Sequence, residues 1–227
     1  MVFSVQSCAL IGIEPHPVLC EVDLALQIPS FTLVGLPSSM TQESRDRVRA
    51  AVTNSGLEWP ARKITINLLP SNLPKWGSHF ELAMALGVLG AASGLEVSGL
   101  TIFAVGELSL SGRIRPCGWL ASISDWLLDR TLEIKERTVV FAHSADIAVL
   151  KRCRPELELI AVDDIKQAAA ALFRIIADSK SVNAQTPRTV VRRQVEASAL
   201  TLSRVQNEPL GVVAALLLDA RQREVDR

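Results

Sequence analysis

The chain has 227 residues, of which 48% are apolar, and its 24 lysines and arginines balance 24 aspartates and glutamates. That length suffices for a sizeable core, and the apolar fraction excludes a disordered protein. The zero net charge excludes a general attraction to nucleic acid or anionic membranes, so such binding needs a local basic patch. The four scattered cysteines lack CxxC spacing, which is typical of free thiols in a reducing compartment, and no metal site is predicted.

Targeting and membrane signals are not evident. The start, MVFSVQSCALIGIEP, has no basic segment and no long apolar run, so it is interpreted as a first strand. The longest apolar run, Phe80 to Ala92, is shorter than the roughly 20 residues that span a bilayer. We therefore expect a cytoplasmic protein without a membrane contact.

The N-terminal part is predicted to form two long strands, 3–13 and 18–28, joined by a turn at 14–17. In the second strand apolar and polar residues alternate, which is typical of a half-exposed antiparallel sheet. A short strand, 31–37, precedes a helix over 38–56, for which Ser39 and Gln42 form a capping-box pattern and Gly56 marks the end.

The rest of the first three quarters of the chain alternates between strands and helices. The predicted order is strand 62–70, a buried helix from 80, strand 101–108, a hairpin over 106–116 turning at Ser111–Gly112, helix 119–130, strand 137–143, helix 144–151, strand 157–162 and helix 163–176. An antiparallel front half followed by βα units predicts an α/β domain over residues 1–176, with a mixed sheet and helices.

Residues 177–207 break this pattern and are predicted to be a polar, weakly basic linker, followed by a C-terminal helix over 208–227. The linker carries Arg192 and Arg193 among four arginines, with only one glutamate between 182 and 207. It is interpreted either as a solvated tail or as an arm that contacts nucleic acid or a partner subunit.

The stretch LLPSNLPKWGSHFELAMALGVLGAASG, residues 68–94, places Ser78 beside His79 just before the buried helix. Two interpretations are open: a catalytic loop with a serine nucleophile, or the entry to a core helix. Adjacent residues at a helix start point about 100° apart, which places Ser78 and His79 poorly for sharing a proton. The pattern favours Ser78 as an N-cap, with Glu81 closing a capping box.

Several linked blocks carry a family resemblance: LVGLPSSMTQESRDRVRAAVTNSGLEWPARKITINLLPSNLPKWGSHFELAMALGVL and, further on, GELSLSGRIRPCGWL. Over about residues 1–175 the chain resembles the N-terminal domain of the magnesium-chelatase-like ATPases of the ComM/YifB type. The resemblance implies a ribosomal-protein-S5-domain-2-like fold, similar to the Lon proteolytic domain. In that family the domain precedes an AAA+ ATPase module, and ComM-type proteins are implicated in DNA branch migration during natural transformation.

The chain departs from the family where catalysis would occur. It contains no G-x-x-x-x-G-K-[ST] loop, so ATPase activity does not carry over, no cofactor is expected, and an AAA+ ATPase partner is implied. Alignment with the Lon serine and lysine motifs places His79 and Ala121 at the two catalytic positions. The resemblance therefore implies a non-catalytic scaffold rather than an enzyme. The alternatives are a serine hydrolase with a displaced site at Ser78 and His79, or a degenerate, truncated family member.

Related Lon-like domains contact DNA and form rings, so a homo-oligomer with local basic patches is expected. The DNA-binding candidates are Arg45, Arg49, Lys63, Lys75, Arg113, Arg115, Arg192 and Arg193. Solvated surface cations, paired locally as Glu43–Arg47 and Asp46–Arg49, are the alternative interpretation. The four tryptophans near turns and helix starts are either core lids or interface anchors.

Overall fold

The computed structural model describes residues 2–35, 38–73, 75, 77–94, 97, 99–133 and 137–185. The chain divides into two compact units, Met1–Ser181 and Val182–Arg227. Of the second unit only the last residues of one helix are described. The architecture below is that of the first unit.

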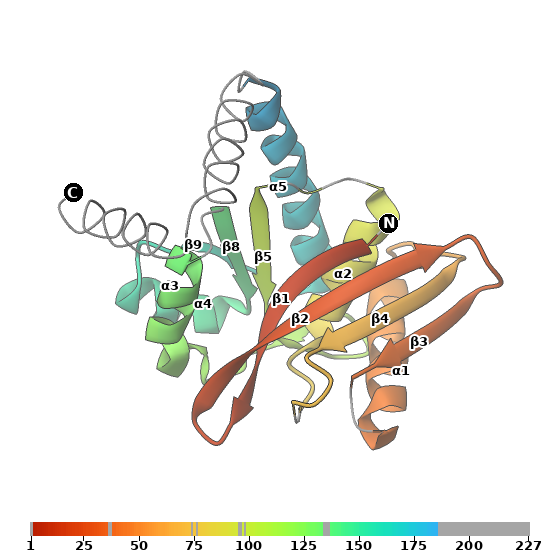
Figure 1. Cartoon of the computed structure of the whole chain (residues 1–227), viewed down its shortest axis with the longest axis horizontal. Coiled ribbons are helices and arrows are strands. Elements are labelled where there is room, and N and C mark those ends of the chain that lie inside the picture. Colours follow the sequence, from red (N-terminus) through yellow and green to blue (C-terminus); the bar gives the residue numbers. More distant parts are fainter. Residues whose placement is uncertain are drawn as a thin grey trace, which may run out of the picture. The chain divides into compact units, whose positions relative to one another are not determined.

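A seven-stranded mixed sheet organises this unit (Figure 1). Its strands, in spatial order, are β3 (Ser30–Val34), β4 (Lys63–Leu69), β2 (Glu14–Ala25), β1 (Val2–Ile11), β5 (Leu100–Ala104), β8 (Arg137–Ala142) and β9 (Glu158–Ala161). The β1–β2 and β2–β4 pairs are antiparallel, and the β3–β4, β1–β5, β5–β8 and β8–β9 pairs are parallel. The predicted α/β class with a mixed sheet is confirmed, although the front half is not wholly antiparallel, because β3 pairs parallel with β4.

The turn between β1 and β2 lies earlier than predicted. Ile11 pairs with Glu14, so Gly12, with φ +64°, lies in the turn and residues 14–17 belong to β2. Proline removes a backbone donor and is tolerated in a strand where one edge is unpaired. Pro15 and Pro17 meet this condition because the pairing of β2 with β4 begins only at Leu19.

Helices cover the sheet unequally. On one face α1 (Ser38–Asn54), α2 (Glu81–Ser93) and α5 (Ile165–Gln185) pack against the core side chains of β1 to β5 and β8. On the other face η1 (Leu120–Ile123), α3 (Ser124–Glu133) and α4 (Ser144–Cys153) pack on Cys8, Phe103 and Val140. The remaining part of that face, on β2, β3 and β4, carries partly exposed polar groups such as Asn67, which donates to Glu21 at 3.4 Å.

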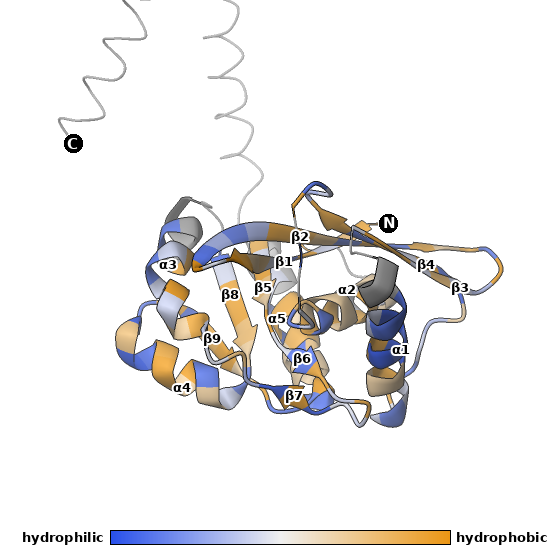
Figure 2. Ribbon diagram, turned by 90° about the horizontal axis from the view of Figure 1, so that it is seen from below, coloured by the Kyte–Doolittle hydropathy of each residue, from blue (hydrophilic) through white to orange (hydrophobic). Residues whose placement is uncertain are grey.

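The predicted buried helix after residue 80 is confirmed. Every residue of α2 from Glu81 to Ala91 is buried, and Gly94 ends the helix in the left-handed conformation, with φ 65°. Figure 2 shows the contrast between α1, which is largely hydrophilic, and β8, which is largely hydrophobic. The position of α2 is therefore dictated by burial along its length, whereas α1 buries only a stripe.

The hairpin predicted to turn at Ser111–Gly112 is confirmed as β6 (Glu107–Leu108) and β7 (Ile114–Arg115). It pairs apart from the main sheet, so the strand predicted over 101–108 is divided into β5 and β6. Gly112 has φ +82°, and an added Cβ would lie only 1.9 Å from Ser55 Oγ. Because residue 112 has no side chain, the hairpin can pack closely against the end of α1.

The predicted boundary at residue 176 falls inside α5, because this helix continues to Gln185. Residues 177–185 are therefore helical rather than part of a linker. Residues 186–227, with Arg192, Arg193 and the predicted helix over 208–227, lie outside the described residues, as does the side chain of Ser39 in the predicted capping box. Within the described part no helix is long and apolar enough to cross a membrane.

Candidate functional site

The start of α2 is held by backbone hydrogen bonds to Gly106, not by a side-chain cap. Gly106 N donates to His79 O at 2.9 Å, and Leu82 N donates to Gly106 O at 3.0 Å. The N-cap residue is Phe80, and the predicted cap at Ser78 is wrong. A helix start needs partners for its free N–H groups, and here Gly106 provides one in place of a serine hydroxyl.

Glu81, predicted to close a capping box, instead has its carboxylate inside the protein. Its side chain is fully buried, and Oε1 accepts from Arg47 Nε at 2.9 Å and from Ser44 Oγ at 3.3 Å. Oε2 accepts from Leu108 N at 3.0 Å. Burial raises the pKa of Glu81 to about 7, although the Leu108 amide, Arg47 and Ser44 act to lower it and Glu107 acts to raise it. The carboxylate thus joins α1, α2 and β6 without reaching solvent.

Arg47 is shared among three carboxylates. It contacts Glu43 at 3.8 Å, which confirms the predicted pair one helical turn away, and Glu107 at 4.0 Å. Only its contact with Glu81 reaches a wholly buried partner. The contact was not predicted, although a single charged residue opening the apolar stretch ELAMALGVLGAA signals a carboxylate that must be buried and paired.

His79 lies among aromatic rings. Its ring centroid is 4.2 Å from that of Phe80 and 5.2 Å from that of Trp119, in an edge-on arrangement. Burial lowers the pKa of His79 to about 4, against an opposing effect of the Cys8 backbone. None of the described hydrogen bonds joins His79 to Ser78, and His79 Nε2 is buried without a partner. The two alternative catalytic residues are therefore adjacent in sequence but do not form a nucleophile–base pair in the described contacts.

The absence of a side chain at Gly77 leaves room for the His79 ring. Its φ is +92°, and a Cβ built there would lie 2.9 Å from His79 Nδ1. A side chain at residue 77 would therefore be strained in its backbone and would press on the imidazole. The loop before α2 is specified by glycine geometry and ring packing.

Lys75, predicted as a DNA contact, is not a surface cation. Its side chain is fully buried, and Nζ donates to the carbonyls of Gly35 and Leu73, each at 3.2 Å, and to that of Pro70. Burial lowers the pKa of Lys75. An ammonium has three donors, and three backbone carbonyls satisfy them here, so Lys75 cross-links the loop to the end of β3.

A second buried carboxylate fixes the turn that resembles the Lon lysine motif. Asp146 accepts from Cys117 N at 2.8 Å and from Gly118 N at 2.9 Å, through its two oxygens. Ala121 follows in η1 and supplies no titratable group. The roles of Asp146 and Lys75 carried no sequence signal that distinguishes them from surface charges.

The other basic candidates are distributed over several elements. Arg45 is half-buried on α1, with its guanidinium 5.6 Å from the ring centre of Phe31, whereas Arg49 is exposed. Lys63 is half-buried on β4. Arg113 and Arg115 are exposed around β7, and Arg113 forms a backbone bridge with Asp164. The exposed candidates in the described part are therefore Arg49, Arg113 and Arg115.

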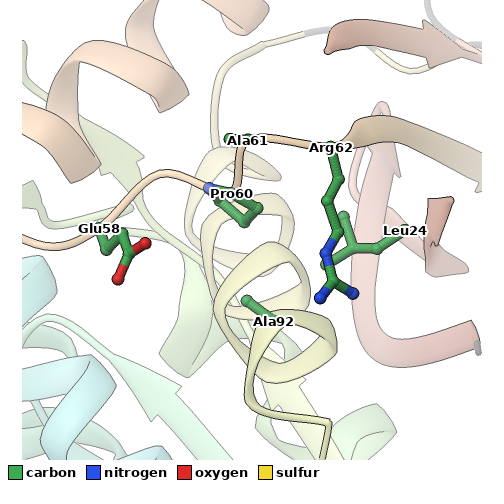
Figure 3. Close-up of a pocket in the computed structure, with 6 residues that line it drawn as sticks. All are labelled: Leu24, Glu58, Pro60, Ala61, Arg62 and Ala92. Atoms are coloured by element: carbon green, nitrogen blue, oxygen red, sulfur yellow. The ribbon is translucent and has the colours of Figure 1, made fainter. Parts of the chain in front are cut away.

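A small cleft lies at the opposite end of α2 (Figure 3). It has a volume of about 300 Å³ and is lined by Leu24, Glu58, Pro60, Ala61, Arg62 and Ala92. The side chains of Glu58 and Arg62 lie on opposite sides of Pro60. Within the described residues no cluster of three or more histidine, cysteine, aspartate or glutamate side chains could hold a metal ion.

Comparison with known proteins supports the resemblance. The family model described as subunit ChlI of Mg-chelatase matches residues 20–131. Protein YifB of Salmonella typhimurium and competence protein ComM of Haemophilus influenzae are each 45% identical over 112 residues. An uncharacterised protein of Mycobacterium tuberculosis is 46% identical over 111 residues.

These matches cover about half of the chain, 48–49%, and 22% of the length of each relative. The matched segment contains β4, α2, the loop before it and the β6–β7 hairpin. Residues 20–131 thus match the family described as subunit ChlI of Mg-chelatase, and over 112 residues the chain is similar to YifB and ComM.

Proposed function

We propose that this chain is a non-catalytic scaffold that self-associates and supports DNA processing, with ATP hydrolysis supplied by an AAA+ module elsewhere. The relation to ComM, which is named a competence protein, supports the DNA-processing part of the proposal. The resemblance to Lon-like domains supports the scaffold part.

The observation that carries the proposal is the inward direction of the titratable side chains described in the loop before α2 and at the first residue of α2. Lys75 binds three carbonyls, His79 packs on Trp119, and Glu81 binds Arg47 and Leu108. A serine nucleophile needs a base within hydrogen-bond reach and access to substrate. These side chains stabilise the loop and leave Ser78 without such a base among the described contacts.

A peptidase assay tests the non-catalytic part. The purified chain and its Ser78→Ala variant are compared on a casein substrate and on fluorogenic peptides, with Ser111→Ala as a matched control on the exposed hairpin. We expect no turnover by any of the three proteins. Turnover that disappears in Ser78→Ala and persists in Ser111→Ala overturns the scaffold and establishes the hydrolase.

DNA binding is tested separately, by titrating double-stranded DNA at two salt concentrations. Contacts to phosphate weaken steeply with salt, and each contact contributes about 0.9 to the slope of log K against log salt. The Arg113→Ala/Arg115→Ala double variant is expected to reduce that slope by up to about 2. A chain that ignores DNA at low salt contradicts the DNA-processing part and leaves the scaffold to be judged by its self-association.

A further inference from the structure

Strand β3 lies at the margin of the sheet, over α1 (Figures 1 and 2). It pairs with β4 from Ser30 to Val34, and no described backbone hydrogen bond reaches its other side. The carbonyl of Gly35, just past the strand, is already bound by Lys75. The free edge is therefore limited to the strand itself, which presents unpaired backbone donors and acceptors.

This edge lacks the features that usually prevent strand pairing. Natural edge strands are protected by charged residues, proline or bulges, but β3 reads SFTLV and has none of these. The nearest prolines in the sequence, Pro29 and Pro37, lie outside the strand. Large apolar side chains are exposed before the strand, at Leu26 (85%) and Ile28 (87%), and at its last residue, Val34 (47%). An edge of this kind is suited to accept another strand.

We infer that β3 pairs antiparallel with β3 of a second copy of this chain, around a two-fold axis at Thr32. This inference gives the self-association in the proposed function a specific surface. The two sheets then continue into one another, and the β3 edge of each copy is paired. A two-fold contact of this kind is closed, so it produces a dimer and not an open filament.

The side chains of β3 favour a second copy over an unrelated extended peptide. In this register Thr32 lies opposite Thr32, Ser30 opposite Val34, and Phe31 opposite Leu33. Thr–Thr pairs across antiparallel strands are favourable, and no charge lies opposite a like charge. Phe31 and Leu33 already point into the core, so their counterparts would extend the same apolar layer across the axis. The strand is thus complementary to itself.

The register provides a charge-complementation test at a single position. Thr32 is exposed on the open face, so the Thr32→Lys and Thr32→Glu variants should fold, whereas each places like charges opposite one another only in the dimer. We expect each variant alone to self-associate at least about tenfold more weakly than the parent chain. An equimolar mixture of the two is expected to recover the mass of a dimer. Circular dichroism verifies the fold of each variant.

Sedimentation equilibrium measures the masses, and two controls accompany it. Thr32→Val keeps a β-branched residue and is expected to dimerise. Leu110→Lys places a charge on an exposed apolar residue of the β6–β7 turn and is expected to have no effect. At a chain concentration of about 1 mM, a dimer with a Kd near 1 mM is detectable. A parent chain that remains monomeric at this concentration overturns the inference and the self-associating part of the proposed function. Oligomers that persist in Thr32→Lys overturn this surface alone, and the peptidase assay judges the non-catalytic part independently.

Discussion

Arg47 Nε donates to Glu81 Oε1 at 2.9 Å, and this contact joins α1 to the first residue of α2. The Arg47 side chain keeps 30% of its surface exposed, whereas that of Glu81 has none. Replacing one member of a buried ion pair leaves the other charge without water or a partner. The resulting loss of stability is larger than the stability that the intact pair contributes.

Above pH 7, where the Glu81 carboxylate is ionised, Arg47→Met should lower the free energy of unfolding by about 3 kcal/mol, because the carboxylate loses its counter-ion inside the protein. Glu81→Gln should cost less, since an amide is cheaper to bury than a charge. The loss of unfolding free energy in the double variant should be smaller than the sum of the two single losses, by about 1 kcal/mol or more. Urea unfolding measures all three, with Glu43→Gln, at the exposed partner of Arg47, as the control. Additive losses would show that the two residues act independently.

The raised pKa of Glu81 predicts a pH dependence of stability. The folded protein holds this proton up to about pH 7, whereas the unfolded chain loses it near 4.5. Since the folded state binds more protons in between, stability falls as pH rises from about 4.5 to 7, by about 2–3 kcal/mol. Unfolding curves of the parent chain and Glu81→Gln, taken across this window, should diverge in this direction. Parallel curves would contradict the raised pKa.

The lowered pKa of His79 should make the stability depend on pH in the opposite direction. Its pKa is lowered to about 4 from 6.5, so the unfolded chain binds more protons between these values, and stability is lost as pH falls through the window. His79→Phe, which keeps an aromatic ring beside Trp119, should reduce this acid loss by about 1–2 kcal/mol. NMR titration of the imidazole provides a direct check. A pKa near 6.5 would indicate a solvated ring and remove the reason for the effect.

Lys75→Met should destabilise the protein by about 2–3 kcal/mol, because three buried carbonyls lose their donors. Lys63→Met is the matched control, since Lys63 is a half-buried lysine on β4 and its replacement should change stability by no more than about 0.5 kcal/mol. Chemical unfolding compares the two, and DNA titration is run in parallel. Stability unchanged by Lys75→Met, together with weaker DNA binding, would restore Lys75 as a phosphate contact.

Much of the fold could be predicted because its signals are local. The alternation in β2 and β4 and the continuous apolar run of α2 follow from periodicity and burial. The turn before β2 was misplaced because Pro15 and Pro17 resemble turn residues in sequence. Only the sheet order shows that their side of β2 has no strand partner. A proline in a strand can be assigned only when the neighbouring strand is known.

The candidate site was less predictable because its contacts are long-range. Ser78 and Glu81 match a capping box by spacing. In the structure, however, the backbone of Gly106 binds the start of α2, and Arg47 binds the Glu81 carboxylate. Likewise, Lys75 follows a proline in a polar loop, which is a common setting for exposed lysines. Its burial depends on carbonyls of Gly35, Pro70 and Leu73 that converge only after folding.

The central position of β1 has a consequence for synthesis of the chain. One side of this strand pairs with β2 directly after the turn at Gly12, but its other side pairs with β5, where Gln6 meets Phe103. The ribosome must therefore produce most of the front half before β1 is covered on both sides. During that interval the β1–β2 hairpin is a ribbon with an open inner edge, so a nascent chain that ends before β5 presents to chaperones the strand that later becomes the middle of the sheet.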